Sequence, residues 1–145
     1  MDEKDVMILS ALCRDARITL SELAAMLGMS VSSVHKRIRK LESEGVIEKY
    51  TVIVNPQKFD CVTAFLLISA EKPEKVTGEI KNIEDVVEVY QSLGNFNIVA
   101  KVRSQNLDRV GKVTSRISSL DGVMMLECVV TTKRIKEDVW SPGVV

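Results

Sequence analysis

The sequence predicts an α+β chain of two small domains: a three-helix unit, followed by a four-stranded sheet that carries two helices. The first 45 residues contain three segments in which apolar residues recur at helical spacing. After Gly45 the spacing of apolar residues changes from about 3.6 to about 2, which is typical of strands. From Thr63 onward a strand–helix–strand pattern occurs twice. Together these observations favour a helical domain followed by a separate α+β domain.

The N-terminal unit contains the residues that begin and end short helices. A first helix is expected from about Lys4 to Arg14. A second is expected to begin at Thr19, which forms a capping box with Glu22, and to end at Gly28. Ser30 follows almost at once and is a suitable N-cap for a third helix. Two helices joined by such a short glycine turn are typical of a helix-turn-helix.

The segment Val46–Val54 is rich in β-branched residues and is expected to form a strand. This strand would complete a winged helix-turn-helix of three helices plus strand. Asn55-Pro56 then ends it. The expected division of the chain is a helix-turn-helix domain (1–49), a linker strand and hinge (50–60), a sheet domain (61–136) and a C-terminal tail (137–145).

The sheet domain repeats one βαβ pattern. Its expected elements, in order, are strand Ala64–Ala70, helix Pro73–Asn82, strand Val86–Ser92, strand Asn97–Arg103, helix Asn106–Ser119 and strand Val123–Thr132. Two such units in tandem predict a ferredoxin-like βαββαβ fold with both helices on one face of the sheet. The first and last strands carry apolar residues on both faces, whereas a solvated face should alternate apolar with polar residues. We therefore expect the uncovered face to be buried against a second copy, in a homodimer.

The composition, 46% hydrophobic and 28% charged, is typical of a globular protein. No apolar run approaches the roughly 20 residues that a membrane helix needs, and the charged N-terminus is unlike a signal peptide. Cys13, Cys61 and Cys128 match neither a zinc site nor a disulfide framework. We expect a cytoplasmic protein that binds no cofactor, no metal and no membrane.

Net charge is zero, with nine basic and nine acidic residues in 1–60 and eleven of each in 61–145. Nucleic-acid binding would therefore depend on local charge. Residues 30–40 hold four basic side chains and no acidic one, and the polar side chains lie opposite the apolar stripe of the third helix. The predicted contacts to double-stranded DNA are Ser30, Ser32, Ser33, Lys36, Arg37, Arg39 and Lys40. The alternative is that these cations form only a solvated helix face.

The sequence offers no candidate for a catalytic residue. His35 is the only histidine, and its expected place at the edge of the apolar stripe favours packing or a polar contact. It has no partner at the spacing of a metal site, a catalytic triad cannot be assembled around it, and a glycine-rich phosphate loop is absent. We therefore do not expect an enzyme.

A long ordered series of residues also carries a family resemblance. The series includes Asp15-Ala16-Arg17-Ile18-Thr19, Glu22-Leu23-Ala24, Leu27-Gly28-Met29-Ser30 and Leu41-Glu42-x-Glu44-Gly45-Val46-Ile47. It resembles the Lrp/AsnC (feast/famine, leucine-responsive) family of transcriptional regulators over nearly the whole chain. The resemblance implies a sequence-specific DNA-binding regulator that responds to an amino acid or related small effector. It also implies dimers built through the C-terminal sheets, which associate into tetramers or octamers, and pairing of Tyr50–Val54 with its counterpart in the partner.

In the resembled family the effector binds between dimers, near a loop with the pattern Gly, any residue, aromatic, Asp. The corresponding residues here end in Asn97, which replaces the usual acid, and Leu93 replaces a small hydroxylated residue. An amide gives an α-ammonium group a weaker hydrogen bond than a carboxylate does, so the effector is expected to differ, to bind weakly or to be absent. The predicted effector residues are Leu93, Gly94, Asn95, Phe96, Asn97 and Asp121. The alternative for the loop is a tight turn between strands.

Two further functions are alternatives for this sequence. Siroheme decarboxylases resemble the same two-domain architecture, but they need histidines and arginines in the C-terminal domain, and no histidine follows His35 here. The other alternative is a ligand-sensing assembly protein with a vestigial helix-turn-helix, against which the basic face of residues 32–40 argues.

Overall fold

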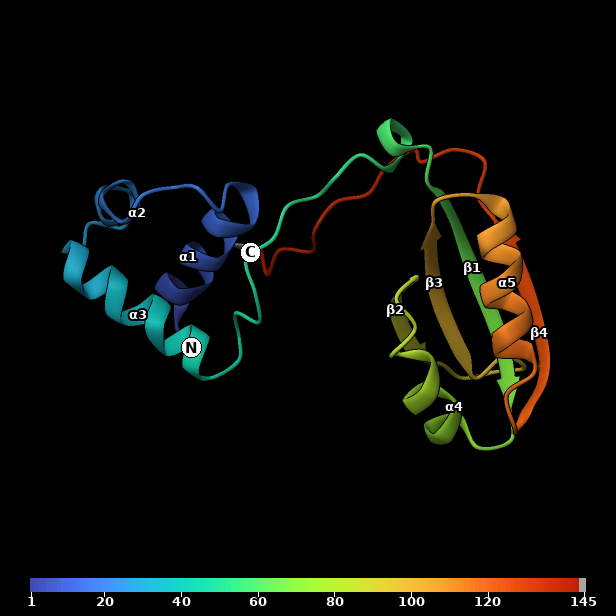
Figure 1. Ribbon diagram of the computed structural model, residues 1–145. Helices are drawn as coiled ribbons and strands as arrows, with labels where there is room; N and C mark the ends of the chain where they lie inside the picture. The colour runs from blue at the N-terminus through green and yellow to red at the C-terminus, as the bar shows by residue number, and fades with distance from the viewer. Residues whose placement is uncertain (144–145) are drawn as a thin grey trace. The chain divides into compact units, whose positions relative to one another are not determined.

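The computed structural model describes residues 1–143, which form two compact units (Figure 1). The N-terminal unit contains Met1–Ile53 and the segment that begins at Lys136, and the second unit is Val54–Ile135. Each unit has its own hydrophobic core. No helix in this described part of the chain is long and apolar enough to cross a membrane.

The N-terminal unit is built from the helices α1 (Glu3–Arg14), α2 (Leu20–Leu27) and α3 (Val31–Ser43). Their apolar stripes meet in one core, in which Ile8, Leu23 and Val34 are completely buried. Because each helix contributes to the same small core, none of the three can pack without the other two. The predicted helix-turn-helix is confirmed, with α2 and α3 as its two helices.

The predicted caps of α2 and α3 are also confirmed. The Thr19 hydroxyl accepts a 3.2 Å hydrogen bond from the Glu22 amide, and the Glu22 carboxylate accepts one of 2.7 Å from the Thr19 amide. Gly28 ends α2 in the left-handed region, at φ +61°, which glycine adopts without a steric penalty. Ser30 caps α3 by accepting from the Ser33 amide at 3.2 Å. Together these caps fix the length of the turn before α3.

The expected strand at Val46–Val54 is not present in the single chain. The segment has no strand, and the next regular element is a short 3₁₀ helix, Pro56–Phe59. Val52 is 78% exposed and Ile53 49%. β-Branched residues favour extended backbone, but a strand also needs a neighbour to pair its backbone groups. Within residues 1–143, no strand pairs with the segment.

After the 3₁₀ helix, the second unit contains the six predicted strands and helices in the predicted order. They are β1 (Val62–Ala70), α4 (Pro73–Ile80), β2 (Val86–Gln91), β3 (Ile98–Ser104), α5 (Leu107–Ser118) and β4 (Val123–Val130). All neighbouring strands are antiparallel, in the order β2-β3-β1-β4. This arrangement confirms the predicted ferredoxin-like βαββαβ fold.

One face of the sheet carries the core of this unit. Alternate residues of β1 and β3, such as Leu66 and Ala100, are completely buried beneath α4 and α5. The opposite face carries Phe65, Tyr90 and Val129, which are between 36% and 59% exposed. The open face is therefore apolar and accessible in the single chain, whereas a sheet face turned to water usually carries polar side chains.

Candidate functional site

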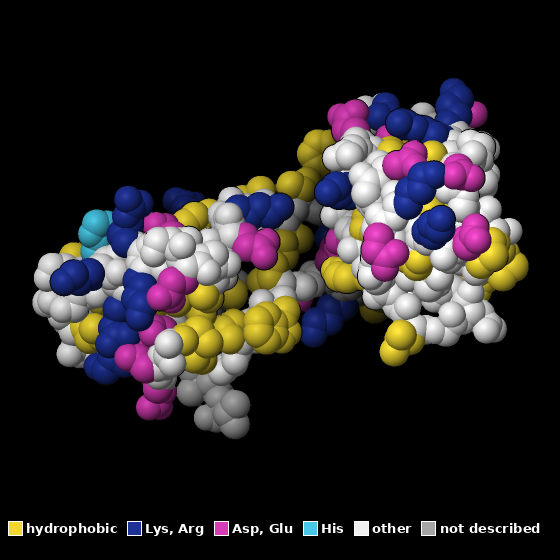
Figure 2. Space-filling view, turned by 90° about the horizontal axis from the view of Figure 1, so that it is seen from below, with side chains coloured by type: hydrophobic (Ala, Val, Ile, Leu, Met, Phe, Trp, Pro, Cys, Tyr) yellow, Lys and Arg dark blue, Asp and Glu magenta, His cyan; other side chains and the backbone are white. Residues whose placement is uncertain are grey.

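The outward face of α3 carries most of the predicted DNA contacts. Ser32, Lys36, Arg39 and Lys40 are all exposed on it. The N-cap Ser30 is exposed as well, and its hydroxyl donates to the Ser33 hydroxyl at 2.8 Å. Figure 2 shows Lys and Arg side chains, together with the histidine, on the surface of the N-terminal unit. The helix thus presents short hydroxyls at its first turn and cations farther along.

The exposed cations of α3 differ in how they are paired. Arg39 contacts Glu42 at 3.3 Å and Lys40 contacts Glu44 at 3.8 Å, in both cases within the helix. Such exposed pairs contribute only about 0.3–0.5 kcal/mol, so a phosphate can replace the carboxylate at little cost. Lys36 has no acidic partner within residues 1–143. It is therefore the cation that is most available for a phosphate.

Arg37 is placed differently from the other predicted DNA contacts. Its Nη1 lies 2.7 Å from a carboxylate oxygen of Asp2, the N-cap of α1, and 2.7 Å from one of Asp5 in the first turn of α1. Hydrogen bonds from Arg37 to Asp5 first, and then to Asp2, raise the pKa of the guanidinium above its ordinary value. The side chain therefore joins α3 to α1, and it is not turned outward with Lys36.

The sequence-based set of outward residues did not include two exposed side chains in the first two turns of α3. His35 is exposed, and not packed at the edge of the core stripe as the helical wheel suggested. Val31 is 44% exposed beside Ser32. An apolar side chain in this position can contact a thymine methyl group, and an imidazole can reach a base edge or a phosphate. The helical wheel does not find them because exposure at its edge depends on where α1 and α2 lie.

The loop of residues 93–97, which carries most of the predicted effector residues, is held by the side chain of Asn97. Its amide nitrogen donates to the Ala70 carbonyl at 2.7 Å, and its amide oxygen accepts from the Ala70 amide at 2.9 Å. The Asn97 backbone amide also donates to the Ile68 carbonyl at 2.9 Å. The side chain thus pairs with the end of β1 as a neighbouring strand would. An aspartate could not make both bonds, because an ionised carboxylate has no donor.

The predicted effector residues lie on loops at one end of the sheet. Asn97 is bonded to Ala70, and the next residue, Glu71, donates its amide to the Gly122 carbonyl at 2.8 Å. Asp121 precedes Gly122 and pairs with Lys75 of α4, which lowers the pKa of the Asp121 carboxyl. The fold therefore connects the Asn97 loop and the Asp121 turn through the end of β1.

The remaining effector residues are less constrained. The Leu93 side chain is fully exposed, Gly94 has φ +115° and Asn95 is exposed. Phe96 is half-buried, and its carbonyl accepts from the Ser92 hydroxyl at 2.9 Å. The loop therefore has a rigid base at Asn97 and an accessible tip at Leu93.

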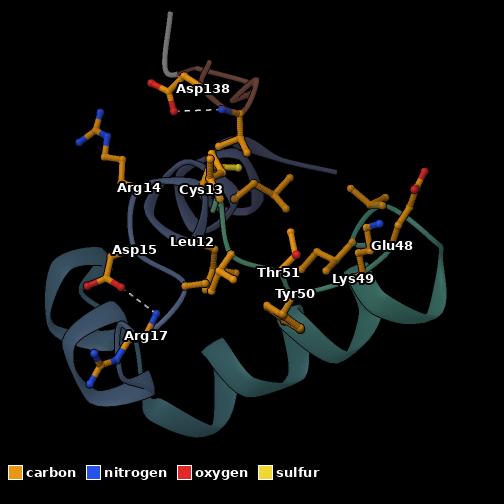
Figure 3. A pocket seen from close by; sticks show the side chains of 17 residues that line it. Leu12, Cys13, Arg14, Asp15, Arg17, Glu48, Lys49, Tyr50, Thr51 and Asp138 are labelled. Carbon is orange, nitrogen blue, oxygen red and sulfur yellow. Dashed lines mark hydrogen bonds between the residues drawn. The ribbon is translucent and has the colours of Figure 1, made fainter. Parts of the chain in front are cut away.

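A separate cavity of about 630 Å³ lies within the N-terminal unit (Figure 3). It is lined by Leu9, Leu12 and Cys13 of α1, by the segment Val46–Ile53, and by Asp138 and Val139. None of the predicted DNA or effector residues lines it. Within residues 1–143, no three His, Cys, Asp or Glu side chains are grouped so that they could hold a metal ion.

Comparisons with known proteins agree with both units. Residues 1–48 match the family model of the winged helix-turn-helix DNA-binding domain, and residues 63–141 match that of the Lrp/AsnC ligand-binding domain. The HTH-type transcriptional regulator FL11 of Pyrococcus abyssi is 34% identical over 140 residues, which cover 94% of this chain and 93% of that protein.

Solved structures are similar over nearly the whole chain. The leucine response regulatory protein of Mycobacterium tuberculosis has a TM-score of 0.86 at 29% identity, with 97% of this chain and 98% of that chain covered. A Neisseria meningitidis transcriptional regulator, solved as a complex with L-Met, has a TM-score of 0.85 at 21% identity, with 99% and 96% covered. The chain therefore belongs to the Lrp/AsnC family, as a transcriptional regulator with an N-terminal helix-turn-helix DNA-binding domain and a C-terminal ligand-binding domain.

Proposed function

We propose that this regulator reads double-stranded DNA through the outward face of α3, acting as a homodimer whose DNA affinity is modulated by a small effector. The observation that carries the proposal is the set of exposed side chains Ser32, Lys36, Arg39 and Lys40 on one side of the second helix of a helix-turn-helix. The second helix of this motif lies in the major groove, with its N-terminal residues at the base edges. Ser30, Ser32 and Ser33 are thus assigned to the groove, and the cations to phosphates.

The cations should make DNA binding depend on salt. Each neutralised phosphate contributes a slope of about −0.9 to the plot of log K against log salt concentration. Lys36 and Lys40 together should therefore supply about two of these contacts. The net charge of zero means that the local group on α3, and not the whole molecule, provides the attraction.

The double variant Lys36→Glu/Lys40→Glu tests this assignment. We expect weaker binding to genomic fragments selected by the wild type, and a salt slope smaller by about two contacts. The charge-matched control is Lys81→Glu/Lys112→Glu. It changes the net charge by the same amount, but Lys81 lies just after α4 and Lys112 lies in α5. Fluorescence anisotropy at several salt concentrations measures the affinity and the salt slope of each double variant. Equal slopes for the two double variants would contradict the assignment to α3.

The open face of the C-terminal sheet supports the homodimer. Phe65 of β1 and Val129 of β4 are exposed cross-strand neighbours, and Met125 is exposed on the same face of β4. Lys101 also lies on this face, and its charge is paired with Glu88 at 3.0 Å. A mainly apolar face of this kind can be buried against a second copy.

The effector is proposed to bind at the loop end of the sheet, against Leu93, Gly94, Asn95, Phe96, Asn97 and Asp121. The L-Met complex of the Neisseria regulator suggests an amino acid as the class to try first. The side-chain amide of Asn97 is already hydrogen-bonded to Ala70, so its oxygen is a poor acceptor for an α-ammonium group. A site between dimers would be completed only in a tetramer or octamer.

Titration with each proteinogenic amino acid tests the effector. We expect a change in operator affinity with at least one of them, and we expect Asp121→Asn to weaken the response more than the exposed control Asp138→Asn does. If no amino acid alters DNA affinity or thermal stability, the effector is of another class. The relatives are named as regulators, and we propose no catalytic role for the chain.

A further inference from the structure

The N-cap and the first turn of α1 make polar contacts to both helices of the helix-turn-helix. The contacting residues are Asp2, Lys4 and Asp5, which we call the α1 bracket. Asp5 is the one buried carboxylate among them, at 6% exposure. A buried charge persists only where it is paired, so the bracket must hold a defined geometry.

The acidic part of the bracket holds α3. Asp2 and Asp5 form a capping box, in which each carboxylate accepts from the other's backbone amide at 2.9–3.0 Å. The remaining oxygen of each carboxylate faces Nη1 of Arg37 at 2.7 Å. One guanidinium nitrogen is thus fixed between two carboxylates that the capping box has already oriented. The position of Arg37 on α3 is therefore tied to the N-terminus of α1.

The basic part of the bracket holds the end of α2. The Lys4 ammonium donates to the Leu27 carbonyl at 2.8 Å. At this end the Gly28 and Met29 amides donate to the Ala25 and Ala24 carbonyls, which leaves the Leu27 carbonyl without a partner in its own helix. A cation is favourable at a helix C-terminus. Lys4 thus fixes the last residue of α2, directly before the turn that leads to α3.

The two contacts together constrain the angle between α2 and α3. Apolar core packing is not directional, whereas these hydrogen bonds fix both distance and orientation. A helix-turn-helix requires its first helix to cross the DNA backbone while the second enters the groove, so a rotation of α3 would move Ser32 and Lys36 away from their contacts.

We propose that the α1 bracket is a positioning device for sequence reading, which sets the orientation of α3 while touching no DNA itself. The proposal rests on the assignment of α3 as the reading helix. It differs from a purely stabilising role in one consequence. Loss of the bracket reduces discrimination between operator and random DNA, whereas lower stability alone would weaken binding to both by the same factor.

The test variants are Asp5→Asn and Lys4→Met. One control is Glu3→Gln, which removes a charge in the same turn but outside the bracket. The other control is Lys4→Arg, which keeps the hydrogen-bond donor. Affinities are measured for a selected operator duplex and a scrambled duplex of equal length, at several salt concentrations. Thermal unfolding establishes the folded fraction of each variant.

We expect Asp5→Asn and Lys4→Met to lower the ratio of the two affinities by about tenfold, comparable to losing one base contact. Their salt slopes should match the wild type, because no phosphate contact is removed. Glu3→Gln and Lys4→Arg should keep the wild-type ratio. Because Lys4 is only half-buried, Lys4→Met provides a folded variant even where Asp5→Asn does not fold.

An unchanged ratio in folded Lys4→Met, with or without a lower melting temperature, would overturn the proposal and leave the DNA function standing. A changed salt slope would also overturn it, because the bracket would then contact phosphate. A wild-type chain that does not discriminate between the two duplexes contradicts the reading function of α3, and the inference falls with it.

Discussion

At the scale of single residues, Asn97 of the predicted effector loop has a clear structural role. Its side chain uses both its donor and its acceptor on Ala70. A family aspartate at this position would be free to face a ligand, because it could not pair with that carbonyl. The amide thus closes the loop onto β1 within the chain itself.

We expect Asn97→Asp to destabilise the chain by about 1–2 kcal/mol, because one hydrogen bond is lost and a carboxylate oxygen faces the Ala70 carbonyl. Asn95→Asp, on the exposed tip of the same loop, should alter stability by less than about 0.5 kcal/mol. Urea unfolding of the C-terminal unit measures both. Equal stability of the two variants would show that the Asn97 pairing contributes little.

Glu22 gives a prediction for pH. The backbone amide of Thr19, and then its hydroxyl, lower the pKa of the Glu22 carboxyl below its ordinary value. A lowered folded-state pKa contributes stability that is present above the unfolded pKa, about 4.3, and is lost as pH falls through the folded pKa. We expect Glu22→Gln, which keeps the capping acceptor, to lose less stability than the wild type on acidification from about pH 5 to pH 3. Thermal unfolding across this range measures the difference, and parallel curves would argue against it.

At the scale of elements, the turn between α2 and α3 depends on one glycine. Gly28 has φ +61°, and an added Cβ would meet no atom within 4 Å, so any cost of a side chain here is conformational. We expect Gly28→Ala to destabilise the chain by about 1–2 kcal/mol.

The matched control is Gly111→Ala, in the middle of α5, where a Cβ also meets nothing within 4 Å and φ is not positive. It should stabilise the chain by about 0.5–1 kcal/mol. Opposite signs in denaturant unfolding would confirm that backbone conformation is the cause. A destabilising Gly111→Ala would contradict this account.

At the scale of the whole molecule, affinity for DNA depends on the proposed pairing of two chains. One α3 carries only a few exposed cations, and the net charge is zero. Joining two such helices through the open sheet face makes binding of the second half-site intramolecular, which raises affinity by about 10²–10⁴.

We therefore expect Val129→Asp, on the open face, to give monomers in sedimentation analysis and to lose most of this gain on a two-half-site duplex. Leu107→Asp, an equally drastic change at the start of α5 on the helix-covered side, should leave the sedimentation behaviour and the DNA affinity unchanged. If Val129→Asp sediments as the wild type does, the sheet face is not the interface.

Much of the fold follows from local patterns. The capping box at Thr19, the turn at Gly28 and the repeated βαβ pattern each predicted an observed element. The strand expected at Val46–Val54 is absent from the single chain, because a strand depends on a neighbour that no local pattern reveals. The capping box at Asp2 was not anticipated either, although Asp2 and Asp5 have the spacing of one.

For the candidate site, the sequence by itself determined that α3 is a helix with a basic outward side, because helical periodicity and local charge are both encoded within a few residues. Only the tertiary structure decided which of those side chains are available. In the fold, Arg37 pairs with Asp2 and Asp5, whereas Lys36 has no acidic partner within residues 1–143. His35 is exposed, and the Asn97 side chain is hydrogen-bonded to Ala70. These outcomes depend on residues up to 35 positions away, since a side chain's partners are set by packing between elements and not by its neighbours in sequence.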